Sequence, residues 1–323
     1  MSLLARSFRA ITLLLVASFL GSAGAAAQTW PSRPITLVVA FPPSTTTDYA
    51  ARAIAQELSK SFGQPIVVEN RTGGGGVIAS QAVAKAAPDG YTLLMTTIGP
   101  AVLRPLIDPN LHYDPIADFT PVSLVGEAPN LLASAPKLGF NGVRDLVAYA
   151  KGNPGKLSVG HSGPGTMGHL VALLFASEAG IEPNLIAYAG SPPIIADLAG
   201  GHIDAGSIAY GSPVGTAKVL AVTTKERLAF LPDVPTMGES GYPNVTGATW
   251  SGLFGPAGLP PEIVTRLNQG ISEFLARQEV RDQFHKVGYR TLGGPPDRLR
   301  QQMAEDHAKW SKVIASAKIG GDR

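Results

Sequence analysis

Residues 159–170, VGHSGPGTMGHL, match two motifs that carry different chemistry. The GHSGP part resembles the nucleophile elbow of hydrolases, a tight strand-to-helix turn that would expose the hydroxyl of Ser162. The GPGTMG part, residues 163–168, matches the glycine pattern of a dinucleotide-binding loop. A third interpretation is a loop that binds an anion without any reaction.

The hydrolase motif lacks one of its required small residues. A nucleophile elbow needs a small residue two positions after the serine, and Pro164 stands there with a fixed φ that disfavours such a turn. The downstream histidines, His285 and His307, lie in charged stretches that predict solvent-exposed helix faces. We therefore expect no catalytic residue and no enzyme, with an exported serine hydrolase using Ser162 as the alternative.

The dinucleotide motif follows a predicted strand and precedes a predicted helix, but it lacks its acidic residue. An Asp or Glu should follow the second strand and bind the ribose. Tyr188 and Gly190 occupy that region, and Glu182 precedes the strand instead. We therefore expect no cofactor.

Both motifs share the physical features of an anion site. Glycines after a strand let the N–H groups at a helix start approach a negative charge, which the helix dipole also favours. Ser162 and Thr166 add two hydroxyl donors, and a carboxylate only accepts hydrogen bonds. The loop is therefore predicted to bind a carboxylate.

The elements that must position this loop form two similar halves. The first alternates predicted strands 35–41, 64–70 and 90–97 with helices 49–63 and 77–86. The second alternates strands 156–162, 183–189 and 202–208 with helices 167–180 and 194–201. Such an order predicts parallel sheets with right-handed crossovers and ligands beyond the carboxyl ends of the strands. The sequence therefore predicts an α/β protein of two lobes, each a mostly parallel sheet flanked by helices, with a ligand cleft at the hinge.

Two apolar stretches, 119–136 and 248–258, are predicted to cross between the lobes, with Trp250 in the hinge core. The helices predicted after them, 260–278, 279–288 and 295–317, should return to the first lobe. These crossings predict lobe 1 at residues 28–125, lobe 2 at 126–248 and a returning segment at 249–323.

Two further helix starts carry hydroxyl groups. Residues 44–47, STTT, precede the first predicted helix, and Ser191 is predicted to be the N-cap of the helix that follows it. Such residues are ordinary helix caps when they occur singly. Three of them on the same predicted sheet edge favour a shared ligand.

The remaining polar motifs either predict no binding site or allow two interpretations. Residues 72–76, TGGGG, lack the lysine of a P-loop and predict a tight turn. His161 and His169 are eight positions apart with no acid spaced to join them, so no metal site is expected. His169 is either a ligand contact or a cap. Asp48 and Asp204 lie at the ends of corresponding segments of the two lobes. Each either binds the ligand or has a local role, as a helix cap for Asp48 and in a strand-end turn for Asp204.

The first 27 residues are predicted to be a cleavable signal peptide. Arg6 and Arg9 precede an apolar run, 11–21, and Ala25 and Ala27 place the cut before Gln28. The run is shorter than the ~20 residues of a membrane span, which is the alternative interpretation. The chain has no cysteine to carry a lipid anchor or form a disulfide. We therefore expect the mature protein in the periplasm.

The mature chain carries no net formal charge. Two of its 26 Lys and Arg residues lie in the predicted signal, so 24 basic residues face 24 Asp and Glu. This balance gives no electrostatic reason to expect a nucleic acid or an anionic membrane as a partner.

Stretches along almost the whole chain resemble one family. They include WPSRPITLVVAFPP, TDYAARAIAQELSKSFGQPIVVENRTGGGG, YDPIADFTPVSLV, PGKLSVGHSGPGT, YAGSPPIIADLAGGHID and GLFGPAGLPPEIVTRLN. The chain resembles the periplasmic solute-binding proteins of tripartite tricarboxylate transporters, called the Bug family. The resemblance implies a hinged, two-lobed binding protein that closes on a small organic acid. We expect a monomer that captures a di- or tricarboxylate, an aromatic acid or an amino acid and delivers it to the membrane permease subunits of the transporter. The alternative is a binding protein that senses its ligand and has no transport role.

The resemblance also implies the residues of the site. In the family, the loop after the first strand and the SGxGT loop bind one carboxylate, and by position these are residues 41–48 and 162–166. The chain departs from the family at Ser44, Thr45 and Thr46, where glycines are usual, and it is shorter at 210–218. The predicted ligand contacts are Phe41, Pro43, Ser44, Thr45, Thr46, Thr47, Asp48, Thr97, Ser162, Gly163, Gly165, Thr166, His169, Tyr188, Gly190, Ser191 and Asp204.

Overall fold

The first half of the fold is built on β1 (Ile35–Val39), which lies between β2 (Ile66–Asn70) and β3 (Thr92–Thr97) in parallel register. The computed structural model describes residues 30–211, 214–317 and 319, so the predicted signal peptide lies outside the described residues. Helices α2 (Thr46–Phe62) and α3 (Val77–Ala84) make the two crossovers. Ile35, Val38 and Val39 are fully buried, as their continuous apolar run predicts for a strand that is covered on both faces.

The second half repeats this plan. Strand β5 (Ser158–His161) lies parallel between β6 (Asn184–Ala187) and β7 (Ala205–Ala209). The accompanying helices are α5 (Val143–Gly152), α6 (Met167–Ala179) and α7 (Ser191–Gly200). The strand orders β2-β1-β3 and β6-β5-β7 are therefore equivalent, and the predicted repeat is confirmed.

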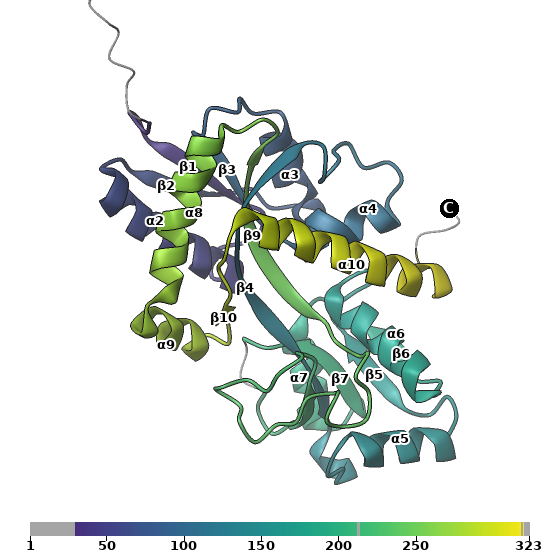
Figure 1. Cartoon of the computed structure of the whole chain (residues 1–323). Helices are drawn as coiled ribbons and strands as arrows, with labels where there is room; N and C mark the ends of the chain where they lie inside the picture. The colour runs from purple at the N-terminus through teal and green to yellow at the C-terminus, as the bar shows by residue number, and fades with distance from the viewer. Residues whose placement is uncertain (1–29, 212–213, 318, 320–323) are drawn as a thin grey trace, which may run out of the picture. The chain divides into compact units, whose positions relative to one another are not determined.

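Two long strands join the halves (Figure 1). Strand β4 (Phe119–Ser134) pairs with β9 (Ala248–Pro256) along its first part. From Asn130 onward it pairs with β7, and nearby with β8 (Lys218–Val222). The two-residue β10 (Arg290–Thr291) pairs with β4 on the first half's side. The two predicted crossing strands are thus present, and β4 changes partners at Asn130.

Short helical segments connect these elements. They are η1 (Gly74–Gly76), η2 (Gly99–Leu103), α4 (Arg104–Ile107) and η3 (Pro136–Leu138). The described residues of the shortened segment 210–218 form bends and turns up to the start of β8.

The C-terminal helices pack mostly on the first half. Helix α8 (Pro261–Ala276) lies against α2 and β4, and α9 (Gln278–Lys286) lies against α8. Helix α10 (Pro296–Ser316) packs on β4, η2 and α4, but it also contacts α6 of the second half (Figure 1). The last helix therefore bridges both halves instead of belonging only to the first.

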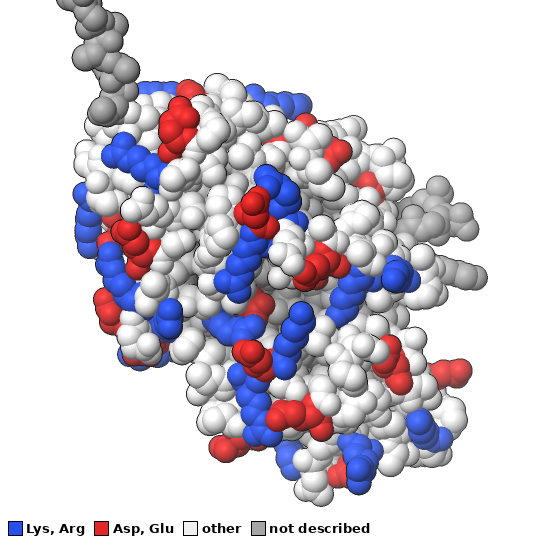
Figure 2. Space-filling model, in the orientation of Figure 1, with Lys and Arg blue, Asp and Glu red and all other residues white. Residues whose placement is uncertain are grey.

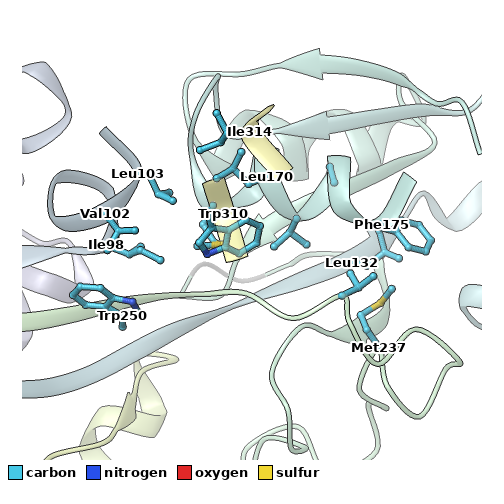
Figure 3. Close-up of a cluster of buried hydrophobic side chains, with 14 of the residues drawn as sticks. Ile98, Val102, Leu103, Leu132, Leu170, Phe175, Met237, Trp250, Trp310 and Ile314 are labelled. Atoms are coloured by element: carbon cyan, nitrogen blue, oxygen red, sulfur yellow. The ribbon is translucent and has the colours of Figure 1, made fainter. Parts of the chain in front are cut away.

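Apolar side chains from both halves form one continuous core around α10. Trp310 is fully buried, and it lies among Leu103 of the first half and Leu170 of the second (Figure 3). Trp250 on β9 belongs to the same cluster at 2% exposure, which confirms its predicted place in the hinge core. The hinge strands and the last helix therefore share one buried core with both halves.

Helix α7 begins at Ser191, three residues before the predicted helix 194–201. Gly190 is its N-cap, and Ser191 is the first helical residue. The predicted capping by Ser191 is wrong, because Gly190 is the N-cap and no described side chain caps this helix. The Ser191 hydroxyl instead accepts a hydrogen bond from the Ala209 N–H at 3.1 Å.

The surface charges are mixed. Figure 2 shows acidic and basic side chains interspersed over the face in view, as the formal neutrality of the mature chain predicts. Within the described residues, no helix has the length and hydropathy of a membrane span. Those residues also contain no group of three or more potential metal ligands.

Candidate ligand-binding site

A cleft of about 850 Å³ opens where the two halves meet the hinge strands. Ser162 and Thr166 line its wall in the second half, and Phe41 and Thr97 line it in the first. Asn130 of β4 and Thr249 of β9 contribute from the hinge. Of the predicted contacts, Phe41, Thr97, Ser162, Gly165 and Thr166 line this cleft. Gly163, in the same loop as Ser162, does not line it.

Thr166 organises the loop before α6. It is the N-cap of that helix, and its hydroxyl accepts from the His169 N–H at 3.3 Å. The same hydroxyl donates its only proton to the Gly163 carbonyl at 2.7 Å. In the 3.1 Å contact between Ser162 and Thr166, Ser162 must therefore be the donor. The Ser162 hydroxyl can rotate toward a ligand oxygen without disturbing the cap.

The start of α6 supplies further donors. The N–H groups of Met167 and Gly168 have no carbonyl acceptor within the helix, and both residues line the cleft. A Cβ at Gly168 would lie 2.9 Å from the Ser162 Oγ and 3.1 Å from the Ser207 carbonyl, so only glycine fits there. The loop thus combines a hydroxyl, free N–H groups and the positive end of the helix dipole, which together suit a carboxylate.

His169 supports this loop from behind. Its Nδ1 accepts from the Gly165 N–H at 3.1 Å, and its ring stacks on that of His161 with centroids 4.2 Å apart. Burial, and then the neighbouring His161, lower the pKa of His169 to about 4. His169 does not line the cleft. Of the two predicted interpretations, its geometry therefore favours a local role, as a neutral ring that orients Gly165.

This lowered pKa makes stability depend on pH. In the unfolded chain His169 takes up a proton near pH 6.5, whereas the folded protein resists protonation until about pH 4. The neutral His169 ring therefore contributes its full stabilisation of the folded state above pH 6.5, and this stabilisation is lost as the pH falls toward 4. Between pH 7 and pH 4.5 the wild type should lose free energy of unfolding through this group, and His169→Asn should not. We therefore expect the loss in the variant to be smaller by about 1–2 kcal/mol, since the half-buried ring is partly screened by solvent. Urea titrations at both pH values measure this, and parallel losses would contradict it.

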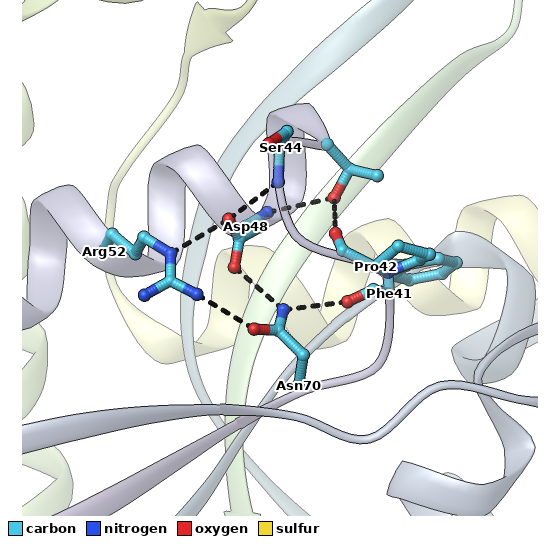
Figure 4. Close-up of polar contacts among 7 residues, drawn as sticks. Phe41, Pro42, Ser44, Asp48, Arg52 and Asn70 are labelled. Carbon is cyan, nitrogen blue, oxygen red and sulfur yellow. Dashed lines mark hydrogen bonds and ion pairs between the residues drawn. The ribbon is translucent and has the colours of Figure 1, made fainter.

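The loop after β1 is braced by Asp48 (Figure 4). The Asp48 Oδ2 accepts from the Ser44 N–H and the Arg52 Nε, both at 3.0 Å. Its Oδ1 accepts from the Asn70 Nδ2 at 2.8 Å. Burial alone would raise the pKa of Asp48, but the hydrogen bonds from Arg52 and Asn70 outweigh it and lower the pKa. The carboxylate is therefore fully engaged inside the first half.

The hydroxyl-rich residues of this loop are not part of the cleft lining. Thr45 caps α2, which starts three residues before the predicted position, and donates to the Pro42 carbonyl at 2.9 Å. Ser44 has φ 68°, a left-handed conformation that glycine adopts at less cost than serine. The Thr46 methyl lies 3.3 Å from the Cβ position of Gly211, in the second half. Neither Pro43 nor residues 44–48 line the cleft.

Four other predicted contacts lie elsewhere. The Tyr188 hydroxyl donates to Asp197 at 2.6 Å, and Gly190 and Ser191 form the start of α7 outside the cleft lining. Asp204 precedes β7 and accepts from the Ser158 N–H and Oγ at 3.0 and 2.8 Å. Because β5 and β7 are parallel, this is the edge of the sheet opposite to Ser162. The structure therefore does not bring Asp204 to the cleft, and its turn interpretation holds.

Of the two histidines that were candidates for a hydrolase base, only one lies on an exposed helix face as predicted. His307 is exposed on α10, as predicted. His285 is only partly exposed, because its ring packs against Phe230 with centroids 5.2 Å apart. Neither residue lines the cleft.

Sequence reasoning missed Asn130, which lies in the cleft at the point where β4 changes partners. Its side chain is 1% exposed, and its Nδ2 has no hydrogen-bond partner among the described residues. The buried His161 Nδ1 and Ser207 Oγ also have none there. Strand pairing puts all three on one face of the sheet, beneath α6. A lone amide inside the apolar stretch 119–136 was the available signal.

The fold and this cleft define a two-lobed solute-binding protein of the periplasmic type, with its ligand site at the hinge. A profile described as "Tripartite tricarboxylate transporter family receptor" matches residues 50–319. The chain belongs to this family, so the predicted family and fold class are confirmed.

Several relatives cover nearly the whole chain. The Protein BugT of Bordetella pertussis is 36% identical over 312 residues, which cover 94% of this chain and 96% of that protein. The structure of Rpa4515 of R. palustris with adipate has 37% identity and a TM-score of 0.78, covering 90% of this chain and 99% of that one. MatC of Rhodopseudomonas palustris with bound malate has 32% identity and a TM-score of 0.73, covering 88% and 100%.

Proposed function

We propose that this protein captures a small organic carboxylate in the periplasm and delivers it to the membrane permease subunits of a tripartite tricarboxylate transporter. The observation that carries the proposal is the start of α6, where the Ser162 hydroxyl and the Met167 and Gly168 N–H groups line a cleft of about 850 Å³. The relatives with adipate and malate support the same ligand chemistry.

Catalysis is not part of this proposal. The family is a receptor family, and the Ser162 hydroxyl contacts Thr166, with no hydrogen bond to a histidine among the described residues. A serine hydrolase would need such a base next to Ser162.

The remaining parts of the proposal concern the mature chain. We infer export by the N-terminal signal with cleavage before Gln28, and a monomer in solution. Lobe 1 would comprise residues 28–125 and 249–323, and lobe 2 residues 126–248. The change of partners by β4 at Asn130 supports a hinge close to the first boundary.

Thermal melting of refolded residues 28–323 tests the ligand class. The panel holds citrate, C4–C6 dicarboxylates, acidic amino acids, nicotinate and aromatic dicarboxylates, each with its amide as the control. A ligand at about 100 times its Kd adds roughly 2.7 kcal/mol, or several degrees for a chain of this size. A shift with an acid and not with its amide supports the proposal. No shift with any acid would contradict it.

The loop before α6 gives a sharper prediction. Thr166→Ala removes both the cap of α6 and the hydroxyl that positions Ser162, so we expect about tenfold weaker binding by calorimetry. Thr265→Ala is the matched control, because that exposed hydroxyl only bonds to Pro261 within α8. Equal affinities in the two variants would count against this loop as the carboxylate site.

A further inference from the structure

The first half contributes one cation to the cleft. Arg104, at the start of α4, is the only Lys or Arg among the described residues that line it. Its guanidinium donates to the Gly74 carbonyl at 3.3 Å and forms no salt bridge with any described residue. The side chain is partly exposed, and among the described residues no carboxylate lies within ion-pair distance of it.

The glycine turn before α3 contacts this side chain. A Cβ at Gly75 would lie 3.7 Å from the Arg104 Nε, and Gly75 itself has φ 67° and lines the cleft. Larger side chains at this turn would approach the guanidinium. The TGGGG stretch, which lacks the features of a phosphate loop, thus holds Arg104 through the Gly74 carbonyl.

Arg104 also lies close to the loop before α6. Ile107 is three residues further on α4, and its Cδ1 is 2.8 Å from the Cβ position of Gly165. Residues three apart share a helix face, so Arg104 lies about one helical turn from this contact between the halves. The cleft therefore has two positions that attract anions, one on each wall.

Asp108 is the one acid among the described residues of the cleft lining. Its Oδ1 accepts from the Asn110 N–H at 3.0 Å, and it forms no salt bridge with Arg104. Asp108 therefore accepts within its own turn, and the guanidinium donors that do not bond to Gly74 remain available for a ligand.

We propose that Arg104 binds a second acidic group of the ligand, so that the protein selects small dicarboxylates over monocarboxylates of the same length. The proposal rests on the carboxylate function proposed above. A guanidinium can bind a carboxylate through two parallel hydrogen bonds, which gives geometric selection as well as attraction. The carboxylate at the start of α6 and the one at Arg104 would then hold the two halves together.

Calorimetry with matched ligand pairs tests this role. The probes are succinate, glutarate and adipate, each compared with its monoamide, which keeps the length and one carboxylate. We expect the wild type to bind its best diacid roughly tenfold to hundredfold more tightly than the monoamide. Arg104→Gln should bring the diacid close to the monoamide and change monoamide binding by less than about threefold. Arg104→Lys keeps the charge and should restore part of the preference.

A control variant and the wild type distinguish failure of the Arg104 proposal from failure of the carboxylate function. Arg144→Gln, on the exposed side of α5, is the control and should leave the preference unchanged. A diacid preference that survives in Arg104→Gln overturns the role of Arg104, as does a wild type that prefers monoamides. A wild type that binds none of the acids in either panel contradicts the carboxylate function itself.

Discussion

Replacing Asp306 with alanine is expected to lower the free energy of unfolding by about 3–5 kcal/mol. Its Oδ2 accepts from the Trp250 indole N–H at 2.7 Å, and its Oδ1 accepts from that of Trp310 at 3.1 Å. Both tryptophans are buried, so the alanine variant leaves two indole donors without an acceptor. Because Trp250 belongs to β9 and Asp306 to α10, the loss also weakens the link between the hinge and the last helix.

Urea denaturation of two further variants tests the argument. Asp306→Asn keeps one acceptor oxygen, so we expect it to satisfy one indole and lose about half as much stability. Glu305→Ala removes the adjacent exposed acid of the same helix, whose contact is with Gln301, and should cost less than about 0.5 kcal/mol. If Asp306→Ala costs no more than Glu305→Ala, the two indoles do not depend on this carboxylate.

Replacing Asn130 with leucine is expected to change stability and affinity in opposite directions. The buried Nδ2 lacks a partner among the described residues, so its removal should stabilise the unliganded protein by about 1 kcal/mol. The same amide lines the cleft and can donate to a bound carboxylate. We therefore expect tenfold to hundredfold weaker binding, as for the loss of a hydrogen bond to a charged group.

Asn268 provides the matched control for this prediction. Its Nδ2 donates to the carbonyls of Val122 and Gly294, both at 2.8 Å, and it lies outside the cleft lining. Asn268→Leu should therefore lose stability by about 1–3 kcal/mol and keep its affinity in calorimetry. A stability loss in Asn130→Leu as large as that in Asn268→Leu would show that the Asn130 amide is already satisfied without a ligand.

Predictions from local sequence agree with the structure where a few neighbouring residues decide the outcome. The apolar run at Ile35–Val39 forms a strand that is covered on both faces. Gly63 and Gly180 end their helices with φ 67° and 60°, a conformation that glycine adopts at little cost. Thr166 caps α6 because its hydroxyl reaches an N–H only three residues away. The repeated strand–helix order likewise predicts the two halves.

The polar residues were harder to assign, because their partners lie far along the chain. Asp48 looks like a ligand contact or a cap, but Asn70 and Arg52 occupy its carboxylate. Asp204 corresponds to Asp48 in the pattern, yet it lies at the amino end of β7 beside Ser158. A residue's type shows which bonds it can form, and only its neighbours in space decide which ones it does form.

The sequence by itself determined the family, the two-lobed fold and the helix start that carries Ser162 and Thr166. These follow from local periodicity, capping chemistry and a motif of adjacent residues. Only the tertiary structure brought Arg104, Asn130 and Thr249 to the same cleft. They come from α4 and two crossing strands, and no local pattern relates them. Their convergence depends on the pairing of β4 with β9 and on the packing of α4 against the second half, which are properties of the folded chain.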